Sequence, residues 1–177
     1  NVPYRIKPYA SLVEDPSQTI AFDWESQHEI EARVSDMGSD GKLVLDSSRQ
    51  VVHVTLAEKL IVLLLAKLTN LVPEGGIWMN TQRPEWNDAN NALVGKGLSV
   101  VTVGYLRRTL AFLQGLLAEV GEDTFEVTEE ASGWFSAMHS VLQKHAAKLV
   151  HGFDDAARLT FLTEAGEAGS AYRWNCY

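Results

Sequence analysis

The sequence predicts an all-α protein, mostly helical with long loops. Apolar residues recur at helical spacing in about five segments, and capping residues stand at the starts of several of them. No segment shows the strong alternation of a half-buried strand. Apolar residues make up 46% of the 177 residues and charged residues 21%, which is typical of a globular chain that can build a core.

The first 54 residues carry the weaker signals. Residues 1–22 hold three prolines and little periodicity, and they predict an extended or irregular segment. Residues 25–35 predict a short helix, which the turn residues 37–41 end. Residues 42–54 alternate weakly and favour a short hairpin around Asp46.

Thr55 begins the first strong helix. Thr55 and Glu58 have the spacing of a capping box, in which the hydroxyl accepts from a first-turn amide and the carboxylate reaches back. Residues 56–71 are apolar nearly all round, which is typical of a helix buried on more than one side. The turn residues 73–76 end this helix.

The longest helical pattern covers residues 99–120. It carries an apolar stripe, and Gly121 suits the left-handed residue that follows a helix. The members of the stripe are Val101, Tyr105, Phe112, Leu116 and Val120. An adjoining apolar stripe consists of Leu106, Leu110, Leu113 and Leu117.

Two more helices are expected towards the end of the chain. Thr128 caps a helix over about residues 129–150, whose apolar face is clean. A shorter helix over residues 154–165 places Asp154 and Arg158 one turn apart, as an ion pair requires. Glycines at 166 and 169 are expected to end it.

The segment between residues 72 and 98 is the one long connection, and such connections tend to be functional. It contains Arg83-Pro84-Glu85-Trp86-Asn87-Asp88-Ala89-Asn90-Asn91, with two carboxylates, one guanidinium, one indole and three carboxamides. A turn that only reverses the chain does not need so many large polar groups. We therefore predict a polar site loop carried between two packed helices.

Asp88 is the candidate general acid in this loop. A carboxyl group against the aromatic wall of Trp86 is desolvated, and desolvation favours its protonated form. The alternative is that Asp88 and the asparagines cap the following helix and satisfy loop amides.

The neighbouring side chains suit a sugar. The two indoles can stack on its apolar faces, the carboxamides can hydrogen-bond its hydroxyl groups, and the guanidinium can hold an anion such as phosphate or a substrate carboxylate. These substrate-binding candidates are Arg83, Trp86, Asn87, Asn90, Asn91 and Trp78.

Within this region the chain reads Glu85-Trp86-Asn87-Asp88-Ala89-Asn90-Asn91-Ala92-Leu93-Val94-Gly95-Lys96-Gly97-Leu98-Ser99-Val100-Val101. This stretch resembles the catalytic-acid segment of cellobiose and chitobiose phosphorylases. That family has Asp-Trp-Asn-Asp-Gly-Met-Asn, then a glycine-rich turn, a Glu-Ser pair and an apolar helix. Residues 72–76 also resemble the family's preceding segment, so the resemblance covers residues 71–117.

The resemblance implies an (α/α) toroid that acts on glycosidic bonds by an inverting mechanism, with the general acid at Asp88 and the sugar-stacking indole at Trp86. Glu85 stands where the family has Asp, and Ala89 where it has Gly. The family's downstream phosphate-binding His and Thr-Gly elements are not recognisable. A full toroid has more helices than this chain, so residues 1–177 are expected to form a single helical domain that is a fragment or one piece of a larger (α/α) catalytic domain.

Hydrolysis by inversion requires a second carboxylate that activates water, about 6.5–9.5 Å from the acid. Asp23 and Glu25 are the candidates, because aromatic residues flank them in Phe22-Asp23-Trp24-Glu25. The alternative is a helix start, where acidic residues favour the helix dipole. In a phosphorylase, phosphate replaces the base and no second carboxylate is needed.

Composition argues against several other classes. The net charge of −8 argues against a general nucleic-acid binder. The longest apolar run, residues 60–66, is far shorter than the roughly 20 residues of a membrane span, and no signal peptide is visible. A soluble chain is therefore expected, with the cytoplasm slightly favoured. The single cysteine, Cys176, cannot form an internal disulfide.

No metal or cofactor is expected. His139 and His145 are six residues apart on one helix, whereas two imidazoles that share a metal stand four apart. No P-loop, dinucleotide fingerprint or serine elbow occurs.

The expected function is the cleavage or phosphorolysis of glycosidic bonds by inversion, with an Asp general acid. The alternative is a non-catalytic carbohydrate-binding or assembly module. The expected partners are an oligosaccharide, phosphate and the remainder of a larger enzyme, but neither nucleic acid nor a membrane.

Overall fold

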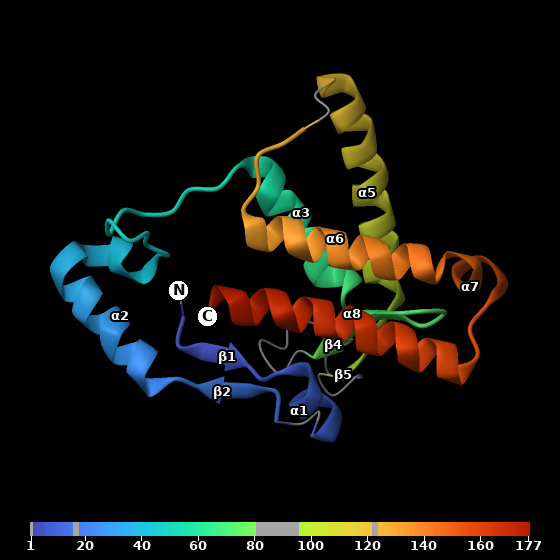
Figure 1. Cartoon of the computed structure of the whole chain (residues 1–177), viewed down its shortest axis with the longest axis horizontal. Helices are drawn as coiled ribbons and strands as arrows, with labels where there is room; N and C mark the ends of the chain where they lie inside the picture. The colour runs from blue at the N-terminus through green and yellow to red at the C-terminus, as the bar shows by residue number, and fades with distance from the viewer. Residues whose placement is uncertain (1, 16–17, 81–95, 122–123) are drawn as a thin grey trace. The chain divides into compact units, whose positions relative to one another are not determined.

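The computed structural model describes residues 2–15, 18–80, 96–121 and 124–177 (Figure 1). The chain divides into two compact units. The first consists of residues 1–55 and 173–177, and the second of residues 56–172. The described ranges contain seven α-helices and five short strands, which confirms the mostly helical expectation. The toroid stays a prediction.

The first unit begins with two short strands, β1 (Tyr4–Ile6) and β2 (Ile20–Phe22), which pair antiparallel. Helix α1 (Tyr9–Glu14) lies between them in the sequence. Strands of three residues are too short to show alternation, and for this reason the sequence predicts only an extended or irregular segment here. The bridge between Leu45 and Val51 confirms the hairpin expected around Asp46.

Helix α2 (Trp24–Met37) confirms the expected short helix and is followed by the 3₁₀ turn η1 (Gly38–Lys42). The turn folds back onto the helix, and Gly41 is buried there. A Cβ atom at Gly41 would lie 2.5 Å from the backbone of Arg33 and Val34. Glycine therefore permits this close approach of two backbone segments.

The second unit contains most of the helices and a three-stranded antiparallel sheet of order β3-β4-β5. The last residues of its final helix, from Arg173 on, belong to the first unit. Its elements are α3 (Leu56–Leu68), β3 (Leu71–Val72), β4 (Gly76–Asn80), β5 (Lys96–Ser99), α5 (Val100–Val120), α6 (Glu129–Lys144), α7 (Ala146–His151) and α8 (Asp155–Cys176).

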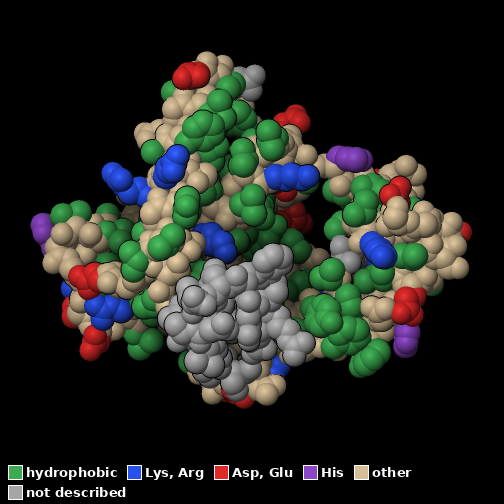
Figure 2. Space-filling view, turned by 180° about the vertical axis from the view of Figure 1, so that it is seen from behind, with side chains coloured by type: hydrophobic (Ala, Val, Ile, Leu, Met, Phe, Trp, Pro, Cys, Tyr) green, Lys and Arg blue, Asp and Glu red, His purple; other side chains and the backbone are tan. Residues whose placement is uncertain are grey.

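Side chains of α3, α6 and α8 form the core of the second unit. Phe161, Met138 and Leu65 are at most 3% exposed. The remaining members of this buried cluster are Trp134, Val141 and Ala165. Many large apolar side chains lie outside this core and are exposed to solvent. Figure 2 shows hydrophobic side chains over much of the face in view.

The expected end of the last helix near residue 165 is wrong, because α8 continues to Cys176. Glycine 169 does not stop the helix but lets it approach Thr69, which follows the end of α3. A Cβ atom there would lie 3.1–3.3 Å from side-chain atoms of Thr69. The expected single helix over residues 129–150 is also divided, since α6 ends before His145 and α7 begins after it.

None of the helices in the described residues has the length and apolar character to cross a bilayer.

Glu58 links two helices that lie far apart in the sequence. Its Oε2 accepts from the Thr128 amide at 2.8 Å, and its Oε1 accepts from the Thr128 hydroxyl at 2.8 Å. The Thr128 hydroxyl in turn accepts from the Ala131 amide and caps α6, as expected. Because Glu58 is only 6% exposed, its carboxylate orients this cap inside the protein.

The Glu58→Gln variant is expected to lower the free energy of unfolding of the second unit by about 1–2 kcal/mol, because charged hydrogen bonds to a buried group are lost. Urea denaturation followed by tryptophan fluorescence measures this. The matched control is Glu167→Gln, a change at an exposed position of α8. Equal stability losses in the two variants would contradict the prediction.

Candidate functional site

The hairpin of β4 and β5 frames the predicted site loop. Its strands pair antiparallel up to the partners Asn80 and Lys96, which stand directly before and after residues 81–95. Ile77 on β4 is 0% exposed and anchors the hairpin in the second unit. The two strands are therefore the described elements that are nearest in the sequence to the predicted site loop.

Trp78 is the predicted sugar-stacking residue that the structure describes. It follows the buried Ile77 on β4, and because strand residues alternate between faces, its indole lies on the open side of the hairpin. Trp78 is 40% exposed, and its amide donates to the Asn70 carbonyl at 2.7 Å. An open indole on a fixed backbone can stack on a sugar ring.

The other predicted residues of this loop lie outside the described residues, in the segment 81–95. Their roles as acid and sugar ligands stay predictions. They are Arg83, Trp86, Asn87, Asp88, Asn90 and Asn91.

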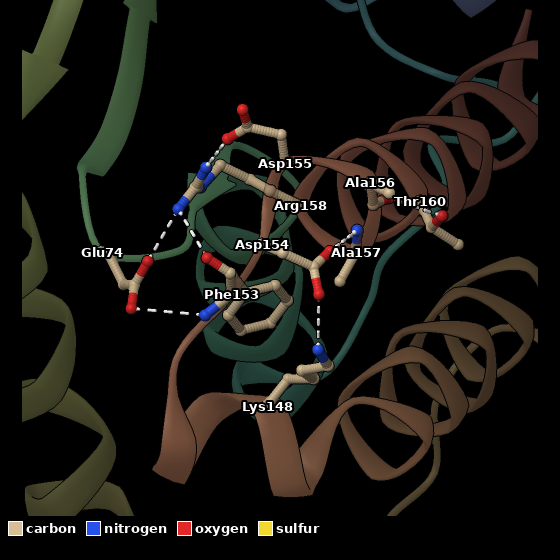
Figure 3. Close-up of polar contacts among 9 residues, drawn as sticks. All are labelled: Glu74, Lys148, Phe153, Asp154, Asp155, Ala156, Ala157, Arg158 and Thr160. Atoms are coloured by element: carbon tan, nitrogen blue, oxygen red, sulfur yellow. Dashed lines mark hydrogen bonds and ion pairs between the residues drawn. The ribbon is translucent and has the colours of Figure 1, made fainter.

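Figure 3 shows how the turn before β4 is held against the start of α8. The Arg158 guanidinium donates to Glu74 Oε2 at 2.7 Å and to Asp155 Oδ1 at 2.8 Å. The Phe153 amide donates to Glu74 Oε1 at 3.3 Å. The hydrogen bond to Glu74 raises the pKa of Arg158 above its usual range. These hydrogen bonds connect the turn between β3 and β4 to the start of α8.

Asp154 has a different role from the one expected. Arg158 pairs with Glu74 and Asp155 rather than with Asp154. The Asp154 carboxylate instead accepts from Lys148 at 2.7 Å and from the Ala157 amide at 2.8 Å. The hydrogen bond from Lys148 and then that from the amide lower the pKa of Asp154. The residue therefore caps α8.

A pocket of about 450 Å³ lies within the first unit, and both predicted base candidates line it. Its walls combine two aromatic rings, three carboxylates, a guanidinium and a hydroxyl group. The lining residues are Arg5, Asp23, Glu25, Ser26, Glu29, Trp174 and Tyr177.

Asp23 is the N-terminal cap of α2. Its Oδ1 accepts from the Ser26 amide at 3.0 Å, and its Oδ2 accepts from the Ser26 hydroxyl at 3.0 Å. Arg5 Nε lies 3.4 Å from the same Oδ2. The Ser26 amide, then its hydroxyl and Arg5, lower the pKa of Asp23. This geometry matches the helix-start alternative, and it makes Asp23 a fixed and weakly basic carboxylate.

Glu25 and Glu29 stand one turn apart on α2, and both are exposed. Across the same pocket, the rings of Trp174 and Tyr177 meet edge to face with centroids 5.4 Å apart. The Arg5 guanidinium lies 4.7 Å from the centre of the Tyr177 ring. Aromatic faces beside carboxylates can stack on a sugar ring and accept from its hydroxyl groups.

A buried histidine of the second unit pairs with a half-buried carboxylate, and the sequence did not indicate this pair. His145 is 7% exposed, and its Nε2 lies 2.9 Å from Glu164 Oε2. Lys144 also donates to Glu164, and this hydrogen bond is the first cause of the lowered pKa of that carboxylate. The partners are far apart in the sequence and carry no motif, so no sequence signal could have found them.

The second unit is expected to lose stability in acid through Glu164. Its folded pKa is lowered from 4.5, so its contribution is fully present above pH 4.5 and is lost as the pH falls through the folded value. At neutral pH, Glu164→Gln should cost about 1 kcal/mol of unfolding free energy, and this difference should shrink as the medium is acidified. Denaturation of both proteins across this pH range measures it. A pH-independent difference would contradict the prediction, and Glu167→Gln is the control.

No group of three or more His, Cys, Asp or Glu side chains that could hold a metal occurs in the described part of the chain. No protein-family model matches the chain, and no curated protein sequence matches it.

Proposed function

We propose that this chain is a carbohydrate-active piece of an (α/α) catalytic domain, which cleaves or phosphorolyses glycosidic bonds by inversion. The observation that carries the proposal is the exposed indole of Trp78 on β4, the strand that precedes in the sequence the segment 81–95 with its Trp86-Asn87-Asp88 motif. An exposed indole that leads into a run of carboxamides and carboxylates is a suitable lining for a sugar site.

In this proposal Asp88 is the general acid. Its proton goes to the glycosidic oxygen as the bond to the anomeric carbon breaks, and the nucleophile attacks from the opposite face of the ring. Trp86 and Trp78 provide stacking surfaces, and Asn87, Asn90 and Asn91 bind hydroxyl groups. Arg83 holds the anion when phosphate is the nucleophile.

The nucleophile is the point on which the two versions of the reaction differ. Hydrolysis assigns the base to Asp23 or Glu25. Asp23 is engaged as a helix cap with a lowered pKa, whereas the exposed Glu25 has no such engagement among the hydrogen bonds of the described residues. Glu25 is therefore the better base of the two. Phosphorolysis needs neither carboxylate.

The experiment is a turnover assay of the 177-residue chain on a panel of oligosaccharides, with and without inorganic phosphate. The proposal expects turnover of at least one compound. A sugar 1-phosphate that forms only with phosphate present identifies a phosphorylase, and a free sugar that forms in both conditions identifies a hydrolase. Absence of turnover throughout the panel would contradict the proposal.

A second candidate function is a non-catalytic carbohydrate-binding module. The pocket of the first unit favours it, because Trp174 and Tyr177 stand there beside Glu25 and Glu29. This function expects sugar binding in calorimetry without turnover. Binding would be lost in Trp174→Ala and kept in Asp88→Asn, whereas the catalytic proposal expects the Asp88 variant to lose turnover.

A further inference from the structure

The turn between β3 and β4 contains a strained residue. Glu74 has a backbone φ of 63°, which lies in the left-handed region that residues other than glycine rarely adopt. Glycine takes this conformation without strain, and two glycines follow Glu74 in the sequence. Strained residues concentrate at functional sites, where the surrounding structure holds them in place. The glutamate at this position therefore requires an explanation in terms of its side chain.

The Glu74 side chain binds the connection between α7 and α8. Its Oε2 accepts from the Arg158 guanidinium at 2.7 Å, and its Oε1 accepts from the Phe153 amide at 3.3 Å (Figure 3). Gly152 in this connection has a φ of 99°, and a Cβ atom there would lie 3.1 Å from Glu74 Oε1. The backbone of the connection therefore leaves room for this one carboxylate.

The stability that this ion pair contributes is too small to explain the strained turn. The side chains of Glu74 and Arg158 are 51% and 28% exposed. Water and salt screen an ion pair at the surface, so that it adds little to the stability of a fold. A left-handed glutamate costs at least as much free energy as such a pair contributes. Stability alone therefore does not account for the glutamate.

The turn leads directly into the strand that carries Trp78. β4 begins two residues after Glu74. Its pairing with β3 covers two residue pairs, and the Trp78 amide adds a hydrogen bond to the Asn70 carbonyl at 2.7 Å. Because so short a pairing leaves the tilt of β4 to its other attachments, the contact between Glu74 and Arg158 fixes the start of this strand relative to α8. The direction of the Trp78 indole then depends on that contact.

We propose that Glu74 is a positioning residue, which together with Arg158 orients β4 so that the indole of Trp78 presents its face to a sugar ring. Glu74 does not touch the sugar but acts through Trp78. The consequence for the reaction rests on the proposed carbohydrate function. The effect of Glu74 on the position of Trp78 does not, because it can be measured without a sugar.

The first test observes Trp78 in the 177-residue chain without a sugar. Nitrogen–proton correlation NMR resolves the indole N–H of each tryptophan, and the signal that is absent in Trp78→Phe belongs to Trp78. Glu74→Gly is expected to shift this signal by more than its linewidth, because it removes the carboxylate and frees the turn. Arg158→Gln breaks the same ion pair from α8 and leaves the turn sequence intact, so it should shift the same signal.

The matched control is Asp155→Asn, which removes the charge of the other carboxylate that Arg158 contacts but leaves the contact with Glu74. Its Trp78 signal should match that of the wild type, and far-UV circular dichroism checks that each variant folds. The proposal is overturned if the Trp78 signal is unchanged in Glu74→Gly or in Arg158→Gln, or if Asp155→Asn shifts it equally.

The second test measures the reaction, on the oligosaccharide that the turnover panel identifies. Glu74→Gly is expected to raise KM about three- to tenfold, the loss that follows when one aromatic stacking contact is weakened, and to change kcat little. In a Trp78→Ala background the same change should raise KM no further, since Glu74 acts through the indole.

An equal rise of KM in both backgrounds, or a loss confined to kcat, would show that Glu74 does not act through Trp78 and would overturn the proposal. Absence of turnover by the wild type contradicts the proposed function instead, and the NMR signal of Trp78 then still decides whether Glu74 positions the indole.

Discussion

Turnover of an oligosaccharide by the Asp88→Asn variant is expected to fall about 10²- to 10⁴-fold, the usual contribution of a general acid. The amide has nearly the same shape as the carboxyl group, but it cannot give a proton to the departing oxygen. The loss should therefore appear in kcat, with KM changed little. Steady-state kinetics of both proteins on the substrate found in the panel measures it.

The leaving group distinguishes a proton donor from a structural residue. The nitrophenolate of a nitrophenyl glycoside leaves without being protonated. Asp88→Asn should therefore lower the turnover of this substrate far less than the turnover of an oligosaccharide. Asp40→Asn, at an exposed position of the η1 turn, is the control and should leave both rates unchanged. An Asp88→Asn variant with unchanged rates, or with equal losses on both substrates, would refute the assignment of the acid.

The second large effect concerns the core. Phe161→Ala is expected to lower the free energy of unfolding of the second unit by about 3–5 kcal/mol, because the ring is wholly buried and its removal leaves a cavity. The Phe161 ring meets His145 at 5.5 Å and Phe153 at 5.8 Å between centroids, both edge to face, and these contacts are lost as well.

Urea denaturation reports this effect through the buried Trp134, which stacks on Tyr172 with centroids 4.2 Å apart. The matched control is Phe135→Ala on α6, where the ring is 51% exposed and its removal should cost less than about 1 kcal/mol. A Phe161→Ala variant that is destabilised no more than Phe135→Ala would show that the core does not depend on this ring.

Elements with local signals could be predicted from the sequence. Helix α5 begins and ends as expected, because the Ser99 cap and the left-handed Gly121 are decided by nearby residues. The Thr128 cap of α6 is correct for the same reason. The helix-start alternative for Asp23 also depends on nearby residues only, because Asp23 caps α2 by accepting from the Ser26 amide.

Features that depend on distant partners could not be predicted. Glycine 169 is a helix breaker by propensity, but in α8 it accommodates Thr69, about a hundred residues earlier. Glu58 has capping-box spacing with Thr55, yet its carboxylate accepts from the amide and the hydroxyl of Thr128, which no local pattern indicates. Tertiary contacts outweigh propensity at such positions.

Contacts between residues far apart in the sequence also limit how well the candidate sites could be predicted. The pocket of the first unit joins Arg5 and Asp23 to Trp174 and Tyr177, from opposite ends of the chain. The apolar stripe of α5 that includes Tyr105 and Phe112 has helical periodicity, yet these two side chains are 64% and 66% exposed. Periodicity alone therefore does not decide which apolar side chains of a helix are buried.

The configuration at the anomeric carbon of the first product tests the proposed function most directly. Time-resolved proton NMR of a turned-over oligosaccharide identifies the anomer before it equilibrates in water. Direct displacement assisted by an acid at Asp88 predicts a product with the configuration opposite to that of the cleaved bond. A product that retains the configuration would contradict the inverting mechanism, because retention requires two successive displacements.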